Sequence, residues 1–451
     1  MARDSLEAFV EIMKLAVIGT GYVGLVSGAC FSHFGFVVAC VDQDAAKIAA
    51  LESGIIPIYE PGLESVVGRS RLNGNLSFTT DLAAAVNGAE AVFIAVGTPT
   101  KAGEDEADLT YVFEAGRQVA RLISSYTVVV IKSTVPVGTA TKLRAIMLEA
   151  NPAAQFDVAS NPEFLREGSA VDDFLHPDRV VIGVNSPEAE KVMRNLYQPL
   201  SASAVPMVVT SSESAELIKY TANCYLAMRI GFVNQVADLC ETVGADIREV
   251  ALGAGLDKRI GLHYFAPGPG FGGSCFPKDT RAMIAMAREH KVPVSIIEDV
   301  VAANERRRVS VAQRVAAVLG SAVKESKIAI LGIAFKADTD DIRDAPALEV
   351  IPALQAVGAK ISVFDPAAME HGRKVFTNVQ WCEDMYSAAK NADAIVVLTE
   401  WNEFRGVDFV KLKNAVRGAV IFDFRNLYQP DDVVKAGFSY HSLGRASRSA
   451  V

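Results

Sequence analysis

The sequence lacks the features of membrane-spanning, secreted and nucleic-acid-binding proteins. Its 451 residues hold no apolar run near the roughly 20 residues of a membrane span, and no apolar core of signal-peptide length stands near Met1. An excess of basic residues is also missing, because 53 acidic and 44 basic residues give a net charge of −9. Such a chain binds polyanions poorly. We therefore expect no membrane and no nucleic acid among its partners, although a local basic pocket for one small anion is allowed.

Cysteine and histidine are also scarce. Six cysteines in 451 residues, with no CxxC pair, do not make a disulfide framework, so we expect a reducing compartment, the cytoplasm. The six histidines show no metal-ligand spacing with cysteine or carboxylate residues. We therefore predict no metal site.

The composition is that of a folded protein with several domains. Half of the residues are hydrophobic and 22% are charged, which excludes a disordered chain, a collagen or a coiled coil as the main state. At roughly 150 residues per domain, the length favours about three domains. Residues 1–12 are expected to be an N-terminal extension and residues 441–451 a flexible tail, because the tail is small and polar.

Short apolar runs alternate with helical patterns over residues 13–210 and again over 321–440. Each run is too short for a helix, and such alternation predicts right-handed crossovers between parallel strands. The expected strands are Leu15–Ile18, Val37–Val41, Ala91–Val96, Val128–Ile131, Phe156–Ser160 and Val180–Ile182, then Ile328–Leu331, Ile361–Phe364, Ala394–Leu398 and Ala419–Phe422.

The middle of the chain, residues 211–320, has helical patterns only. Residues 211–244 contain no proline and one interior glycine, which predicts one long helix; a second helical block from about 280 to 320 is interrupted near Pro293. We therefore predict an α/β fold: two Rossmann-like, doubly wound parallel-sheet domains joined by a long central helix and a helical middle domain.

A glycine motif follows the first expected strand and predicts a dinucleotide site. Gly19 would permit a tight turn, Gly21 close approach of a pyrophosphate, and Gly24 close packing of helix on strand. Asp42 ends the next strand, where its carboxylate would bind a ribose 2′-hydroxyl and repel a 2′-phosphate, which favours NAD over NADP. Lys47 either flanks the adenosine or is a solvated helix charge.

Two later strand ends fit the same crevice. Thr98 follows the strand that begins at Ala91, and Thr134 follows the next strand. Because ligands in such sheets lie beyond the carboxyl ends of strands, these residues are cofactor candidates. Simple loop turns are the alternative.

A glycine-rich stretch from Gly268 to Gly273 leads to Cys275, where a helix is expected to begin. A helix N-terminus and the neighbouring Lys278 both favour a thiolate, so Cys275 has the surroundings of a nucleophile. Asp279 could position water or a lysine. A lone cysteine is more often a small buried hydrophobe, an interpretation that suits the other five cysteines better.

Charged and amide side chains form a third set of candidates. Glu163 and Glu167 follow an expected strand, where a carboxylate could act as a general base; surface carboxylates are the alternative. Lys219 and Asn223 are four residues apart on the long helix and share a face, so they could stabilise an oxyanion. A surface pair with a snorkelling lysine is the alternative.

The second sheet region begins without the full glycine motif. Gly332 stands in the place of the first glycine, but the other two glycines are absent, so a second dinucleotide is not expected. Lys336, Asp338, Asp341 and Arg343 follow at once. They suggest a site for a different phosphate-bearing ligand, or an exposed polar loop.

Six ordered motifs within about residues 13–430 resemble the UDP-glucose/GDP-mannose dehydrogenase family. They are Lys14–Leu25, Ser133–Pro136, Asn161–Phe164, Lys219–Asn223, Gly270–Asp279 and Phe335–Lys336. The glycine loop and the lysine–asparagine segment are most similar to the members that oxidise UDP-glucose. Members that oxidise GDP-mannose or another nucleotide sugar at C6 are the alternative. Ser274 argues against UDP-N-acetylmannosamine enzymes, which typically have histidine before the cysteine.

The resemblance implies a four-electron oxidation in which UDP-glucose, two NAD⁺ and water give UDP-glucuronate and two NADH. It implies a thiohemiacetal and then a thioester on Cys275, an oxygen at C6 held by Lys219 and Asn223, and Glu163 as acid/base for hydrolysis. Water would be oriented by two further residues, which are Thr134 and Asp279.

The resemblance also implies the binding residues and the assembly. A homodimer or higher homo-oligomer is expected, with the long helix as dimer core and Arg259 reaching a neighbouring subunit. The expected NAD contacts are Gly19, Gly21, Tyr22, Val23, Gly24, Asp42, Lys47, Thr98, Thr134, Glu167, Lys278 and Arg343. The expected UDP-glucose contacts are Glu163, Phe164, Leu165, Glu167, Lys219, Asn223, Arg259, Tyr264, Phe265, Gly268, Gly272, Phe335, Lys336 and Arg425. A non-catalytic nucleotide-sugar binder is the alternative from another class, against which Cys275, Lys219 and Glu163 argue.

Overall fold

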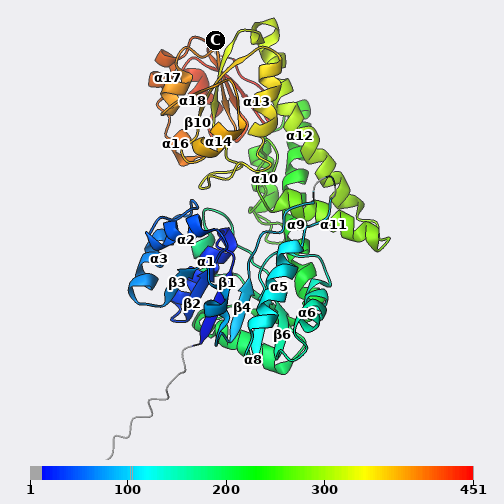
Figure 1. Ribbon diagram of the computed structural model, residues 1–451. Helices are drawn as coiled ribbons and strands as arrows, with labels where there is room; N and C mark the ends of the chain where they lie inside the picture. The colour runs from blue at the N-terminus through cyan, green and yellow to red at the C-terminus, as the bar shows by residue number, and fades with distance from the viewer. Residues whose placement is uncertain (1–12, 102, 104, 450–451) are drawn as a thin grey trace, which may run out of the picture. The chain divides into compact units, whose positions relative to one another are not determined.

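The computed structural model describes residues 13–101, 103 and 105–449 (Figure 1). The chain forms two compact units, the first ending at Lys219 and the second beginning at Tyr220. Each unit contains one β-sheet covered by helices, which confirms the predicted α/β class. The predicted domain boundaries after residues 210, 320 and 440 stay predictions, as do the extension at 1–12, which lies outside the described residues, and the tail at 441–451.

The first unit has an eight-stranded sheet in the order β3-β2-β1-β4-β5-β6-β7-β8. Neighbouring strands are parallel except β6 and β7, which pair antiparallel at Ser160 and Gly183, a departure from the purely parallel sheet expected from the sequence. The strand order reverses between β1 and β4, which is where such sheets bind ligands. The strands are β1 Lys14–Ile18, β2 Val37–Val41, β3 Leu76–Thr79, β4 Ala91–Ile94, β5 Thr127–Ile131, β6 Phe156–Ser160, β7 Val180–Gly183 and β8 Met207–Thr210.

Helices cover both faces of this sheet. Alternate side chains of a strand point to opposite faces, and in β1 both sets are apolar, so each set packs against helices on its own face. Leu15 and Val17 of β1 join a core with α1, whereas Ala16 and Ile18 join a core with α5 and α6. The helices are α1 Tyr22–His33, α2 Ala45–Glu52, α3 Leu63–Leu72, α4 Leu82–Val86, α5 Thr110–Leu122, α6 Thr139–Ala150, α7 Ala170–Leu175 and α8 Pro187–Leu196, with a 3-10 helix at Gln198–Ser203.

The predicted long helix is present as α9, which spans Ser212–Val243 without a break. The predicted second helical block is two helices, α11 at Phe276–Glu289 and α12 at Ser295–Leu319, and the gap between them contains Pro293. A short helix that was not expected, α10, lies at Ile247–Gly255. The segment between α10 and α11 contains the glycine-rich loop.

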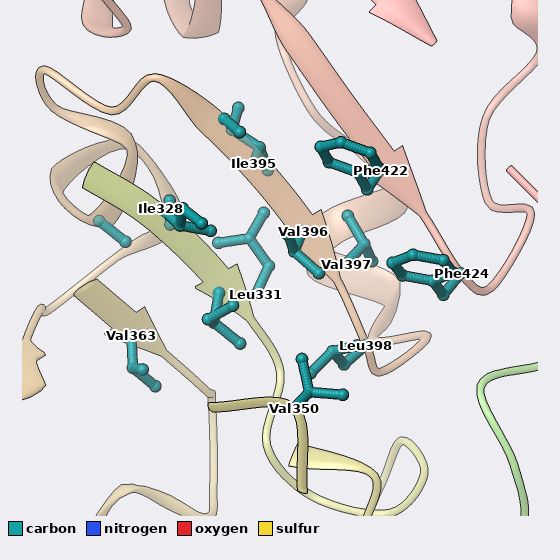
Figure 2. Packing of buried hydrophobic residues seen from close by; sticks show 14 of the residues in the cluster. Ile328, Leu331, Val350, Val363, Ile395, Val396, Val397, Leu398, Phe422 and Phe424 are labelled. Carbon is teal, nitrogen blue, oxygen red and sulfur yellow. The ribbon is translucent and has the colours of Figure 1, made fainter. Parts of the chain in front are cut away.

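The sheet of the second unit has six strands, all parallel, in the order β11-β10-β9-β12-β13-β14. Figure 2 shows side chains of β9, β10, β12 and β13 meeting in one hydrophobic cluster, with Val350 of α13 beside them. The strands are β9 Lys327–Leu331, β10 Lys360–Phe364, β11 Val379–Trp381, β12 Ala394–Val397, β13 Val420–Asp423 and β14 Ser439–Ser442. The helices are α13 Ala347–Ala356, α14 Met369–Val375, α15 Met385–Ala389, α16 Asn402–Arg405, α17 Phe409–Ala415 and α18 Pro430–Lys435, with a 3-10 helix at Gly320–Val323.

Within the described part of the chain, none of the helices combines the length and apolarity needed to cross a bilayer. The same residues hold no group of three or more histidine, cysteine or carboxylate side chains arranged to bind a metal ion.

Candidate active site

The turn between β1 and α1 requires its three glycines for different reasons. Gly19 has φ +96°, and a Cβ there would lie 2.7 Å from the Ala95 carbonyl oxygen; a Cβ on Gly24 would lie 1.9 Å from the Gly19 carbonyl oxygen. By contrast, no atom comes within 4 Å of a Cβ placed on Gly21, which is exposed. Packing therefore explains Gly19 and Gly24. The open face at Gly21 leaves room for a ligand to approach the backbone closely.

The surroundings of this turn favour an anion near the helix and a hydroxyl near Asp42. No side chain caps the N-terminus of α1, and its first turn carries no acidic residue. The Asp42 carboxylate accepts hydrogen bonds from the Thr20 N–H at 2.9 Å, the Thr20 hydroxyl at 2.8 Å and the Lys47 ammonium at 3.1 Å. Burial raises the pKa of Asp42, but these hydrogen bonds outweigh burial and lower the pKa to about 2. Lys47 is thus ion-paired with Asp42.

Two loops at the same edge of the sheet are joined to each other. The buried Thr98, after β4, donates a hydrogen bond from Oγ1 to the carbonyl oxygen of Thr134, after β5, at 3.0 Å. Both residues follow strands beside the point where the strand order reverses. Together with the open face at Gly21 and the carboxylate of Asp42, these residues fit an NAD molecule.

A buried ion pair joins the loop after β6 to α9. The Lys219 ammonium lies 3.0 Å from Glu163 Oε1, and the side chains are only 4% and 6% exposed, which excludes the surface alternatives for both. The other oxygen, Glu163 Oε2, accepts from the Leu165 N–H at 2.5 Å. Burial raises the pKa of Glu163, but the neighbouring Lys219 and these hydrogen bonds outweigh it and hold the pKa below its usual range. The ring centroid of Phe164 lies 5.3 Å from the Lys219 ammonium.

A second buried ammonium in the first unit was not singled out from the sequence. Lys132, directly after β5, lies 2.9 Å from Asn161 Oδ1 and 3.3 Å from the Tyr197 hydroxyl. Burial lowers the pKa of Lys132 to about 7, against the attraction of Glu163. This lysine therefore belongs to the electrostatic surroundings of the Glu163–Lys219 pair.

Glu216 is also buried, one helical turn before Lys219 on α9, and was likewise not singled out. Its carboxylate accepts hydrogen bonds from the Gly138 N–H at 2.6 Å, the Ala140 N–H at 2.9 Å and the Ser160 hydroxyl at 3.2 Å. Burial raises the pKa of Glu216 to about 7, although the hydrogen bonds oppose this. The sequence signal that could have identified Glu216 is its spacing of three residues from Lys219, because residues three apart lie on the same face of a helix.

In the second unit, Cys275 directly precedes α11, and among the described residues it is the one cysteine that is not buried. The fully buried Asp279 accepts a hydrogen bond from Asn223 Nδ2 at 2.6 Å and one from the Lys278 ammonium at 2.6 Å. The Asp279 N–H bonds the Cys275 carbonyl oxygen at 2.8 Å. The structure thus brings together four predicted residues: Cys275, Asn223, Lys278 and Asp279.

The glycine-rich loop lies against the first loop of the second sheet. A Cβ on Gly272 would be 2.2 Å from the Asp344 carbonyl oxygen, and one on Gly273 would be 2.7 Å from the Phe335 ring. Arg425, after β13, donates to the Phe335 carbonyl oxygen at 2.7 Å and lies 3.4 Å from a Cβ placed on Gly268. The predicted substrate residues Gly268, Gly272, Phe335 and Arg425 are therefore neighbours.

The remaining predicted residues are less enclosed. Arg343 is exposed and pairs with Asp341 at 2.7 Å, and Arg259, whose side chain is 88% exposed, pairs with Asp257 at 2.6 Å. Partial exposure is shared by a larger group, consisting of Tyr22, Val23, Leu165, Glu167, Tyr264, Phe265 and Lys336.

Three models of one protein family match the chain. They are the NAD-binding, central and UDP-binding domains of the UDP-glucose/GDP-mannose dehydrogenase family, which match residues 13–201, 213–306 and 329–430. A UDP-glucose 6-dehydrogenase of Rhizobium meliloti (strain 1021) is 50% identical over 435 residues, covering 96% of this chain and 100% of that protein. One of Bacillus subtilis (strain 168) is 46% identical over 435 residues, covering 96% and 93%.

A solved structure shows the same arrangement of elements. The UDP-glucose dehydrogenase of the hyperthermophilic archaeon Pyrobaculum islandicum superimposes with a TM-score of 0.87 at 39% sequence identity. The match covers 93% of this chain and 96% of that one.

Proposed function

Because the chain belongs to the UDP-glucose/GDP-mannose dehydrogenase family, we propose that it oxidises UDP-glucose to UDP-glucuronate with two NAD⁺. The observation that carries this proposal is the accessible Cys275 just before α11, near the buried Asn223 and Asp279 and the partly buried Lys278. An alcohol needs two oxidations to become an acid, and a thiol can hold the aldehyde between them.

The residues of the chain would divide the chemistry as follows. NAD⁺, when bound, supplies the acceptor for each of two hydrides from C6 of the sugar. After the first loss of hydride and of the hydroxyl proton, Cys275 Sγ bonds to the aldehyde carbon and forms a thiohemiacetal. The second loss of hydride and a proton leaves a thioester. Water then adds to the thioester carbon, the C–S bond breaks, and the acid and the Cys275 thiol are released.

Lys219 and Asn223 are proposed to hold the oxygen on C6, where negative charge develops as the thiol and later water add to the carbon. The support for Lys219 is its burial with Glu163, which keeps its ammonium fixed. Glu163 is proposed to take the proton from the attacking water, for which its lowered pKa keeps it ionised. Thr134 and Asp279 are proposed to orient that water.

The choice of UDP-glucose over other nucleotide sugars is supported by the names of the relatives. The two similar proteins from Rhizobium meliloti and Bacillus subtilis are both named UDP-glucose 6-dehydrogenase, and the third matched domain is described as UDP-binding. GDP-mannose, or another nucleotide sugar oxidised at C6, is the second candidate. We also propose that the enzyme works in the cytoplasm, where its six cysteines stay reduced.

A panel of nucleotide sugars with NAD⁺ tests the proposal, with NADH and acid product measured for each. We expect two NADH per UDP-glucose consumed; one NADH would indicate a simple alcohol dehydrogenase, and none a non-catalytic binder. Cys275→Ser should stop acid formation, because its hydroxyl is a far poorer nucleophile than a thiolate. Normal acid output from this variant would refute the thioester route. Stronger activity with GDP-mannose than with UDP-glucose would refute the proposal that UDP-glucose is the substrate.

We further propose a homodimer or a higher homo-oligomer built from such dimers, with α9 at the dimer contact and Arg259 reaching the neighbouring subunit. The support is an apolar stripe on α9, formed by Tyr225, Phe232 and Leu239, which is exposed within this chain. The exposure of the Arg259 side chain agrees with such a role.

A further inference from the structure

The loop that leads to Cys275 is held by a side chain with no part in the chemistry proposed above. Phe271 lies in this loop, outside any helix or strand. Asn304 of α12 accepts a hydrogen bond from the Phe271 N–H at 2.8 Å and donates one from Nδ2 to the Phe271 carbonyl oxygen at 3.0 Å. One amide side chain thus pairs both backbone groups of one residue, as a neighbouring strand would.

Burial makes this attachment strong. Asn304 is 6% exposed and Phe271 is also 6% exposed, so water cannot replace either hydrogen bond without opening the loop. A second asparagine, Asn234 of α9, accepts from the Gly268 N–H at 2.8 Å. The two asparagines thus hold the loop at its first residue, Gly268, and again at Phe271.

The loop also has no room to shift towards α12. Gly270 has φ +119°, and a Cβ there would lie 2.7 Å from Arg308 Cγ and 3.1 Å from Asn304 Oδ1. The backbone of the loop therefore packs directly against side chains of α12. A substitution of Asn304 would change the contacts of Gly270 and Phe271 first.

The side chain of Phe271 carries this constraint to the thiol. Its ring packs edge-on against that of Phe276, with centroids 6.1 Å apart, in a small core that also contains Ala227 and Val300. Phe276 is the first residue of α11 and directly follows Cys275. The position of Phe271 therefore helps to set where the helix begins and where Cys275 Sγ lies.

We propose that Asn304 is a positioning residue for Cys275, acting through Phe271 and Phe276. The proposal rests on the proposed function, since a thiol that captures the aldehyde must be held within about 0.5 Å of its productive position. Without Asn304 the loop moves, the thiol becomes easier to reach from solvent, and it captures the aldehyde less often.

The test compares Asn304→Ala with a matched control, Asn151→Ala. Asn151 ends α6 in the first unit and also uses its amide for backbone contacts, donating to the Ala120 carbonyl oxygen at 2.8 Å and accepting from the Ala153 N–H at 3.1 Å. Two measurements are made on the full-length protein: steady-state kinetics, which give kcat and the KM values for UDP-glucose and NAD⁺, and the rate at which iodoacetamide alkylates Cys275, followed by mass spectrometry of its peptide.

We expect Asn304→Ala to lower kcat at least tenfold with the KM for NAD⁺ within twofold, and to speed alkylation of Cys275 at least threefold. Asn151→Ala should leave kcat and the alkylation rate of Cys275 within twofold of their wild-type values. An unchanged alkylation rate, or an unchanged kcat, in Asn304→Ala would overturn the proposal. If the alanine variant does not fold, Asn304→Asp, which keeps the acceptor but loses the donor, is judged by the same thresholds.

Failure of the proposed function gives a different result. A wild-type protein that forms no NADH from UDP-glucose would refute the function, whereas the alkylation rates would still decide whether Asn304 positions the thiol.

Discussion

Gly21 and Gly24 differ in what surrounds them, which gives a matched pair of variants. Gly24→Ala should lower the melting temperature by several degrees, because its Cβ would lie 1.9 Å from the Gly19 carbonyl oxygen. Gly21→Ala should leave the melting temperature unchanged, since nothing lies within 4 Å, but should raise the Kd for NADH about tenfold by blocking the pyrophosphate. Thermal melts and NADH fluorescence titrations measure both. Unchanged NADH affinity in Gly21→Ala would contradict this assignment.

Residues within short motifs could be singled out from the sequence as candidates, whereas residues that contact and support them could not. Cys275 and Asp279 stand four residues apart after a glycine run, so the pattern itself indicated chemistry. Lys132, directly after β5, and Asn304, in α12, form their bonds with partners 29 and 33 residues away, and neither residue type is unusual at such a position. Only the tertiary fold reveals that they are buried and what they hold.

Glu216 connects three elements around the predicted acid/base residue. Its carboxylate binds the N-terminus of α6 and the last residue of β6, three residues before Glu163, while α9 carries both Glu216 and Lys219. This one carboxylate thus fixes the N-terminal part of α9 relative to the sheet edge that bears Glu163. The structure gives Glu216 a supporting role in which its charge state matters for stability.

The raised pKa of Glu216 predicts a pH-dependent stability difference between wild type and Glu216→Gln. Burial raises its folded pKa to about 7, so between its usual value and pH 7 the folded state holds a proton that the unfolded state loses. Wild-type stability should therefore fall as pH rises through this window, by up to about 1.4 kcal/mol per pH unit, whereas glutamine does not titrate. Melting temperatures of both proteins at pH 5 and pH 8 measure the effect. A melting-temperature difference that does not shift in favour of the variant at pH 8 would contradict it.

Central strands were predictable from the sequence, and edge strands were not. β4 and β5 are buried along their whole length and read as continuous apolar runs. β3, β8, β11 and β14 were missed because each is only three or four residues long and lacks a continuous buried run. In β3 and β14 buried residues alternate with exposed or half-buried ones, and β8 and β11 contain no buried residue. Such short mixed segments form strands only because a neighbouring strand is already in place.

For the whole molecule, the family resemblance and the predicted NAD-dependent oxidoreductase are confirmed by the three matched domains and the full-length relatives. The assembly is a different matter, because one chain shows only what it leaves uncovered. Tyr225, Phe232 and Leu239 are seven residues apart on α9, so they lie along one face, and each is more than half exposed. A soluble protein rarely exposes such a stripe without a partner.

A second copy of the chain is expected to cover this stripe, so that a charge placed in it should dissociate the dimer. Leu239→Glu buries a carboxylate against apolar side chains of the partner, which costs several kcal/mol and should raise the dimer Kd at least a hundredfold. The control is Leu72→Glu, on α3, where an 88% exposed leucine lies in the first unit. Sedimentation equilibrium should give multiples of two chains, each of 48.1 kDa, for wild type and Leu72→Glu, but a single chain for Leu239→Glu. A monomeric wild type at micromolar concentration, or an undisturbed assembly in Leu239→Glu, would show that α9 is not the contact.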